Sequence, residues 1–220
     1  MPDPKVILAV ALVGLAALVG RVAIRRDARP LPRDPAVETN ARLTGAAAMV
    51  LLVPLAAEVV TGVRPGLVPH ALIGFFLLPV VGLKLGSVGY RFTRYYLGDA
   101  RYRADGPPHP IARVIGPALV LATIGLFGTG VELWLFGLQL GEAWLTWHKL
   151  AFALWFVLMV VHVVAYLRPA SELAFADPPD GSRGVFARRS LVLGSLLFGV
   201  ALAIAMLPFS SPFALLPDSS

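Results

Sequence analysis

The chain has 220 residues, of which 57% are hydrophobic and 15% are charged, and its mean hydropathy is +0.76. A soluble domain carries about 45–50% apolar and about 25% charged residues, so this composition indicates an integral membrane protein. The absence of cysteine excludes disulfides, thiolate metal sites, iron–sulfur clusters and thioether-attached haem. The net charge of +6 does not indicate nucleic-acid binding, because most of the basic residues are arginines that gather in particular connections between apolar runs.

Six apolar runs are long enough to cross a bilayer as helices, which need about 20 residues each. In chain order they are Val6–Ile24, Leu43–Gly62, Val68–Tyr90, Val114–Phe136, Ala143–Leu167 and Ser190–Pro208. We therefore expect an all-α integral membrane bundle of six transmembrane helices. The first run is expected to remain as an anchor, because its positive charge follows the apolar residues, which is the reverse of a cleavable signal.

Arginines alternate between the connections that join these runs. The first, third and fifth connections are rich in them: Arg21, Arg25, Arg26, Arg29, Arg33 and Arg42; Arg91, Arg94, Arg101, Arg103 and Arg113; Arg168, Arg183, Arg188 and Arg189. The second and fourth connections hold only Arg64. The positive-inside rule places the arginine-rich connections in the cytoplasm and both termini outside it.

The second and third expected helices resemble the fourth and fifth. Each pair follows an arginine, Arg42 or Arg113, and each first helix ends in Thr-Gly-Val, at residues 61–63 or 129–131. This repeat predicts a four-helix core over residues 42–168, where bundles hold their cofactors between facing helices. Residues 1–41 would form an N-terminal anchor and a basic cytoplasmic loop. Residues 169–220 would form a second cytoplasmic loop and a C-terminal transmembrane helix.

Two histidines, His148 and His162, lie fourteen residues apart on the fifth expected helix. Fourteen residues are close to four helical turns, so both side chains leave nearly the same face, about 21 Å apart along the axis. An imidazole in hydrocarbon is costly unless something binds it. Haem iron is a suitable partner, because a neutral imidazole nitrogen is a standard axial ligand.

A third histidine, His70, lies near the start of the third expected helix, at a depth similar to that of His148. A single histidine at this depth is more often an interfacial residue that is hydrogen-bonded and partly wet. A matched pair on repeated helices instead favours ligation of one haem b by His70 and His148.

Lys84 follows His70 by fourteen residues and so stands where a symmetric pattern would place a partner for His162. Three interpretations remain open. A second haem could be bound by His162 with Lys84 or another group. The second site could have lost its haem, leaving Lys84 to extend its ammonium towards the cytoplasm. His162 and Lys84 could also line a quinone or proton site.

For the other polar and aromatic residues in or near the spans, the sequence supports less specific predictions. Glu58 and Glu132 occupy similar places in the two repeats and would either carry protons or reach water at an interface. His109 is expected to be a solvated loop histidine. The tryptophans are expected to lie mainly in interfacial belts: Trp134, Trp144, Trp147 and Trp155.

The Thr-Gly-Val element followed by His70, and Trp147-His148-Lys149-Leu150 followed by His162, resemble the membrane b-type cytochromes of the cytochrome b561 and formate dehydrogenase gamma-subunit kind. The resemblance covers about residues 42–168. It implies a four-helix haem bundle in which paired histidines hold two stacked haems, and Lys84 departs from that pattern.

The resemblance also implies a place and a role. We expect a protein of the bacterial inner (plasma) membrane, surrounded by membrane lipid, that passes electrons between the quinone pool and an extracytoplasmic redox partner protein. It would act as an electron-transfer subunit of an oxidoreductase complex. The alternative is a non-haem transporter or assembly scaffold, in which Glu58, Lys84 and Glu132 form an ion or proton path.

Overall fold

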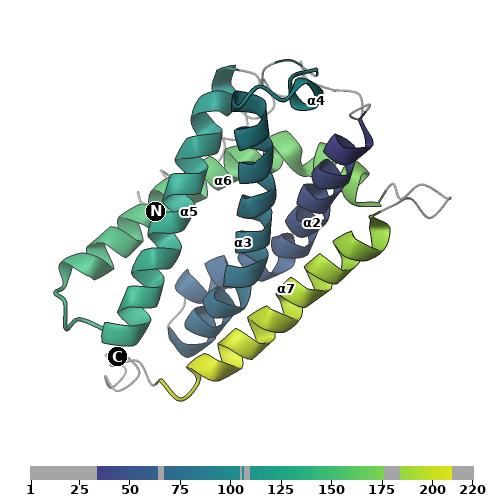
Figure 1. Ribbon diagram of the computed structural model, residues 1–220. Helices are drawn as coiled ribbons and strands as arrows, with labels where there is room; N and C mark the ends of the chain where they lie inside the picture. Colours follow the sequence, from purple (N-terminus) through teal and green to yellow (C-terminus); the bar gives the residue numbers. More distant parts are fainter. Residues whose placement is uncertain (1–33, 64–66, 105, 107–109, 176–183, 210–220) are drawn as a thin grey trace, which may run out of the picture.

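A computed structural model of the chain describes residues 34–63, 67–104, 106, 110–175 and 184–209, and over these residues the regular structure is entirely helical (Figure 1). The helices are α2 (Pro35–Val63), α3 (Leu67–Tyr96), α4 (Ala100–Arg103), α5 (Pro110–Phe136), α6 (Ala143–Phe175) and α7 (Val185–Met206). All but the short α4 are long and apolar enough to cross a membrane, which confirms the expected all-α membrane bundle. The first expected span, Val6–Ile24, lies outside the described residues.

The long helices extend beyond the apolar runs that predicted them, so parts of the connections expected between Tyr90 and Val114 and between Leu167 and Ser190 are helical. Helix α2 begins at Pro35 because the Oδ1 atom of Asp34 accepts hydrogen bonds from the backbone N–H groups of Ala36 and Val37. Helix α6 continues to Phe175, past Pro169. Ion pairs at i, i+4 spacing support both extensions: Arg42 with Glu38 at 2.6 Å, and Arg168 with Glu172 at 3.0 Å.

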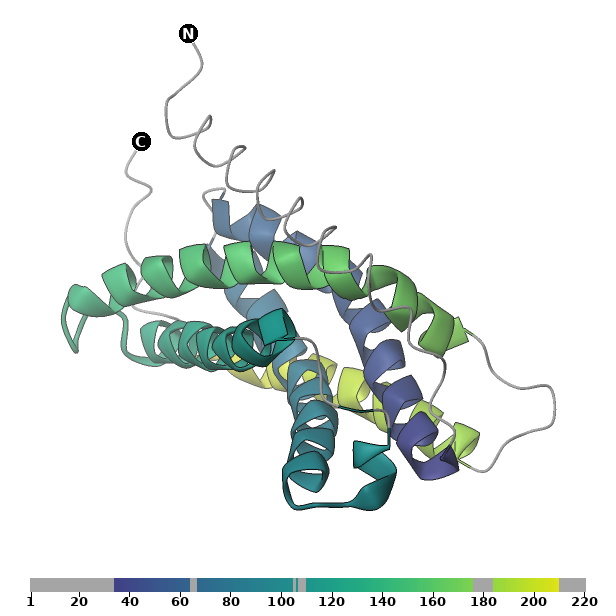
Figure 2. The same ribbon diagram turned by 90° about the horizontal axis from the view of Figure 1, so that it is seen from above.

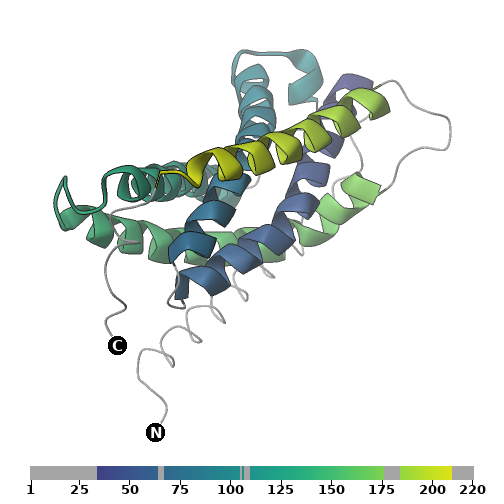
Figure 3. The same cartoon turned by 90° about the horizontal axis from the view of Figure 1, so that it is seen from below.

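Four helices form a closed ring, in which α2 packs on α3, α3 on α5, α5 on α6, and α6 back on α2. Helices α3 and α6 therefore occupy opposite corners. Helix α7 packs on α3 and α2 from outside the ring, and Figures 2 and 3 show it on the opposite side of these helices from α6. We call the end where α3 and α6 begin the histidine end, and the end where α3 stops and α4 lies the arginine end (Figure 1).

Glycines set how closely these helices approach. A Cβ atom on Gly199 of α7 would clash with the carbonyl oxygen of Phe76 in α3. A Cβ on Gly45 of α2 would lie 2.9 Å from the carbonyl oxygen of Ala170 in α6. Small residues allow the backbones of membrane helices to come close together. Such close packing stabilises the bundle, because the hydrophobic effect does not drive helices together in lipid.

Two of the tryptophans expected mainly in interfacial belts are buried between helices, and Trp155 lies near the middle of α6 rather than near an end. Trp155 is only 4% exposed, and its Nε1–H donates to the hydroxyl of Thr123 in α5 at 3.1 Å. Trp134 is 6% exposed and packs edge to face on Phe75, with ring centroids 6.1 Å apart. Trp147, by contrast, is 61% exposed.

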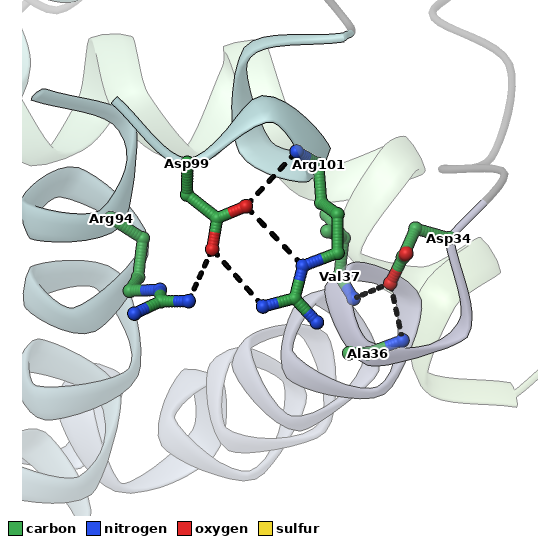
Figure 4. Close-up of polar contacts among 6 residues, drawn as sticks. All are labelled: Asp34, Ala36, Val37, Arg94, Asp99 and Arg101. Atoms are coloured by element: carbon green, nitrogen blue, oxygen red, sulfur yellow. Dashed lines mark hydrogen bonds and ion pairs between the residues drawn. The ribbon is translucent and has the colours of Figure 1, made fainter. Parts of the chain in front are cut away.

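At the arginine end, Asp99 holds the turn between α3 and α4 (Figure 4). Its carboxylate accepts hydrogen bonds from the backbone N–H and the guanidinium of Arg101, and it pairs with Arg94 at the end of α3. The side-chain hydrogen bond from Arg101 is the main reason that the pKa of Asp99 is lowered to about 2, with the bond from Arg94 contributing further.

This lowered pKa gives the turn a defined acid sensitivity. Because the folded pKa lies below the ordinary value of 3.8, the stabilisation is fully present above about pH 4 and is lost as the pH falls towards 2. We expect Asp99→Asn, which keeps a good helix cap, to lower the thermal unfolding midpoint at pH 6 and to converge with the parent chain near pH 2. A variant that matches the parent chain at pH 6, or a gap that persists at pH 2, would contradict this. Glu172→Gln, which changes an exposed pair, serves as the control.

Candidate functional site

His70 and His148 meet inside the ring at the histidine end. His70 lies in the first turn of α3 and His148 in the second turn of α6, so the two rings come from opposite corners of the bundle. Their centroids are 6.3 Å apart and their planes cross at 80°. The sequence prediction that these two residues share one depth is therefore matched by their positions in the fold.

A hydrogen bond at Nδ1 orients each ring. The Nδ1 atom of His70 lies 3.2 Å from the carbonyl oxygen of Glu58, three residues before Thr61. The Nδ1 atom of His148 lies 2.9 Å from the hydroxyl oxygen of Thr129, and this hydroxyl donates its own proton to backbone carbonyls one turn earlier in α5. A carbonyl oxygen can only accept, and the single proton of the Thr129 hydroxyl is already donated, so each Nδ1 carries the proton. Each Nε2 is then left with a free lone pair, which is the state that ligates a metal.

The glycine of each Thr-Gly-Val element lies against the ring that follows it in the chain. A Cβ on Gly62 would lie 2.9 Å from Cε1 of His70, and a Cβ on Gly130 would lie 3.2 Å from Cε1 of His148. A Cβ on Gly62 would force the imidazole to shift, and a Cβ on Gly130 would require the ring to give by a few tenths of an ångström. The repeated element and the turn before it therefore supply both a hydrogen-bond acceptor for each ring and the space in which the ring lies.

Glu58 joins the site, but Glu132 does not occupy the equivalent place. The Oε1 atom of Glu58 lies 3.3 Å from Nδ1 of His70, and a Cβ on Gly74 would lie 3.1 Å from this oxygen. Aligning Thr61 with Thr129 places Glu58 opposite Leu126, so the expected match between the two glutamates is wrong. Both carboxylate oxygens of Glu132 are buried without a hydrogen-bond partner among the described residues.

A second polar level lies nearer the arginine end. Lys84 on α3 is close enough to His162 on α6 for the two side chains to interact electrostatically. The ring of Tyr166, one turn further along α6, lies 4.9 Å from the ring of His162 between centroids. The fourteen-residue spacing on both helices thus brings together a lysine and a histidine. His109 lies outside the described residues.

Sequence reasoning missed the groups that hold the histidines. Every residue has a backbone carbonyl, so nothing marked that of Glu58 beforehand. The repeated Thr-Gly-Val element was the available signal, since the Glu58 carbonyl lies three residues before Thr61 and the Thr129 hydroxyl belongs to the element itself.

Over the described ranges, no three His, Cys, Asp or Glu side chains gather as a site for a bare metal ion would need. A haem iron needs only two protein ligands, because the porphyrin supplies the other nitrogens. The pair formed by His70 and His148 fits that smaller requirement.

No protein-family model matches the chain, and no significant match exists among curated proteins or solved structures. The resemblance to the membrane b-type cytochromes therefore stays a prediction, carried by the residues of this chain alone.

The hydrogen bonds predict a specific tautomer for each ring. In the protein purified without any cofactor, we expect histidine-selective nitrogen NMR to show His70 and His148 protonated at Nδ1, with His70→Ala and His148→Ala used to assign the signals. Rings protonated at Nε2 would contradict the geometry, because Nε2 would then have no lone pair to offer.

Proposed function

We propose that this chain is a membrane b-type cytochrome that holds one haem b between His70 and His148. The observation that carries the proposal is the facing pair of imidazoles, both fixed through Nδ1 and separated by 6.3 Å between centroids. A metal–imidazole bond is about 2 Å long, so this separation would suit one iron held between the two rings. The absence of cysteine means that the haem would be held without a covalent link.

When bound, the haem would supply a one-electron change at its iron. The chain's own residues ligate and orient it. The carbonyl of Glu58 and the hydroxyl of Thr129 hold the two rings, which limits how far they can move. Trp134 and Phe75 are buried side chains within the four-helix bundle, and such apolar surroundings favour a low local dielectric constant.

The proposed orientation of the bundle in the membrane follows from the residues at its two ends. The arginine end would face the cytoplasm under the positive-inside rule, and the histidine end would face outward. We infer that the haem, placed near the outward face, exchanges electrons with an extracytoplasmic redox partner and with quinone dissolved in the bacterial inner membrane.

The decisive test is the haem content of the purified protein. With ample haem supply, we expect reduced-minus-oxidised spectra and a pyridine haemochrome assay to show one b-type haem per chain. His70→Ala and His148→Ala should each lose it, whereas His162→Ala should keep the spectrum nearly intact. A protein without b-type absorbance would contradict the proposal and favour the non-haem ion path through Glu58, Lys84 and Glu132. Two haems per chain, with one lost in His162→Ala, would instead show a second site.

The glycines beside the rings provide a matched set of variants. Gly62→Ala and Gly130→Ala should displace the imidazoles and weaken haem binding about tenfold, the lower end of the range for groups that position metal ligands. Gly82→Ala should have no such effect, because nothing lies within 4 Å of a Cβ there. Haem titration of the three variants checks this. Equal haem affinities across the set would show that the ring positions do not depend on these glycines.

A further inference from the structure

The proposed haem leaves unused a cluster of polar groups near the arginine end, which we call the inner cluster: Lys84, Arg91, His162 and Tyr166. Lys84 and Arg91 lie seven residues apart on α3, so they share one face of that helix. His162 and Tyr166 lie four residues apart on α6, with their rings in contact. The two helices stand at opposite corners of the ring, and the cluster spans the space between them.

Arg91 is the member of the inner cluster whose hydrogen-bonding groups are least satisfied. Its Nε–H is buried and makes no hydrogen bond within the described residues. Its guanidinium is close enough to Tyr166 of α6 and to Tyr102 of α4 to interact with them electrostatically. Tyr102 is itself buried, at 8% exposed. The Nε–H of Arg91 is therefore a buried donor for which the described residues provide no acceptor.

Within the described part of the chain, no salt bridge joins Lys84 or Arg91 to a carboxylate. Glu38 pairs with Arg42, Asp99 with Arg94 and Arg101, and Glu172 with Arg168. Glu58 lies beside His70, at the opposite end of the bundle. Lys84 and Arg91 therefore have no ion-pair partner among these acids, although charges within a membrane are normally paired.

The missing partner should carry negative charge and several oxygen acceptors. A neutral ring such as a quinone offers acceptors but does not compensate two cations. A phosphate does both, and the planar guanidinium of arginine matches its geometry with two parallel hydrogen bonds. Basic pockets between transmembrane helices on the cytoplasmic side are also suited to anionic lipid headgroups.

We propose that the inner cluster binds a phosphate oxyanion, supplied by the headgroup of an anionic phospholipid, with Arg91 and Lys84 as the charged contacts. His162 and Tyr166 line the same site and can donate to the phosphate oxygens. The proposal is independent of haem binding, because the inner cluster shares no residue with the pair formed by His70 and His148.

The test uses the full chain, purified in neutral detergent and stripped of lipid. Thermal unfolding is followed while phosphatidylglycerol, phosphatidylcholine or inorganic phosphate is added, because a ligand that binds only the folded state raises the midpoint. We expect phosphatidylglycerol to stabilise the protein more than phosphatidylcholine does. Equal stabilisation by inorganic phosphate would support the oxyanion site and identify the free ion as its source.

Variants connect the effect to the cluster. Arg91→Gln and Lys84→Met should each weaken phosphatidylglycerol binding about fivefold or more, the effect of one basic residue near an anionic lipid. Arg168→Gln is the control, because it removes the same charge near the same end from a side chain that is 89% exposed. If Arg91→Gln does not fold, Lys84→Met alone still decides the matter. Haem content should stay unchanged in all three variants.

Three results would overturn the proposal. Phosphatidylglycerol and phosphatidylcholine could stabilise the parent chain equally. The two cluster variants could bind phosphatidylglycerol as tightly as Arg168→Gln does. A short-chain quinone could stabilise the parent chain through Lys84 while phosphatidylglycerol does not, which would assign the cluster to an electron carrier instead.

Discussion

The hydrogen bonds that fix the two histidine rings are the interactions on which the rest of this account depends. They join the second helix of each repeat to the first, α3 to α2 through His70 and Glu58, and α6 to α5 through His148 and Thr129. Because each bond uses Nδ1, the Nε2 atom of each ring keeps a free lone pair. The same contacts that connect the helices therefore leave both rings in the tautomer that the proposed haem would need.

Close helix packing makes those hydrogen bonds geometrically available. Gly62 and Gly130 leave room for the rings beside the first helix of each pair, and Gly199 lets α7 press against α3 from outside. In lipid, such contacts and interhelical hydrogen bonds stabilise the packing of the helices, as burial from water stabilises the core of a soluble protein. The two repeats reach the same arrangement with different sequences around the element, since Glu58 in one corresponds to Leu126 in the other.

The sequence predicted the membrane helices and the pairing of His70 with His148, because both depend on strong local signals: apolar runs of spanning length and a repeated element with a fixed offset. It did not predict where α2 and α6 end, because caps and ion pairs such as those of Asp34 and Arg168 extend a helix beyond its apolar run. It also misplaced Trp155, whose indole finds its acceptor on Thr123 of a neighbouring helix. Contacts of this kind depend on how helices pack and leave no periodic trace in the sequence.

Electron paramagnetic resonance of the oxidised, haem-loaded protein tests the central claim most directly. Two imidazole planes that cross at 80° keep the d orbitals of a ferric iron between them close in energy. The account therefore predicts a strongly anisotropic low-spin signal in the parent chain, and its loss in His148→Ala. A high-spin signal alone, or a low-spin signal that survives in His148→Ala, would contradict ligation of one haem by His70 and His148.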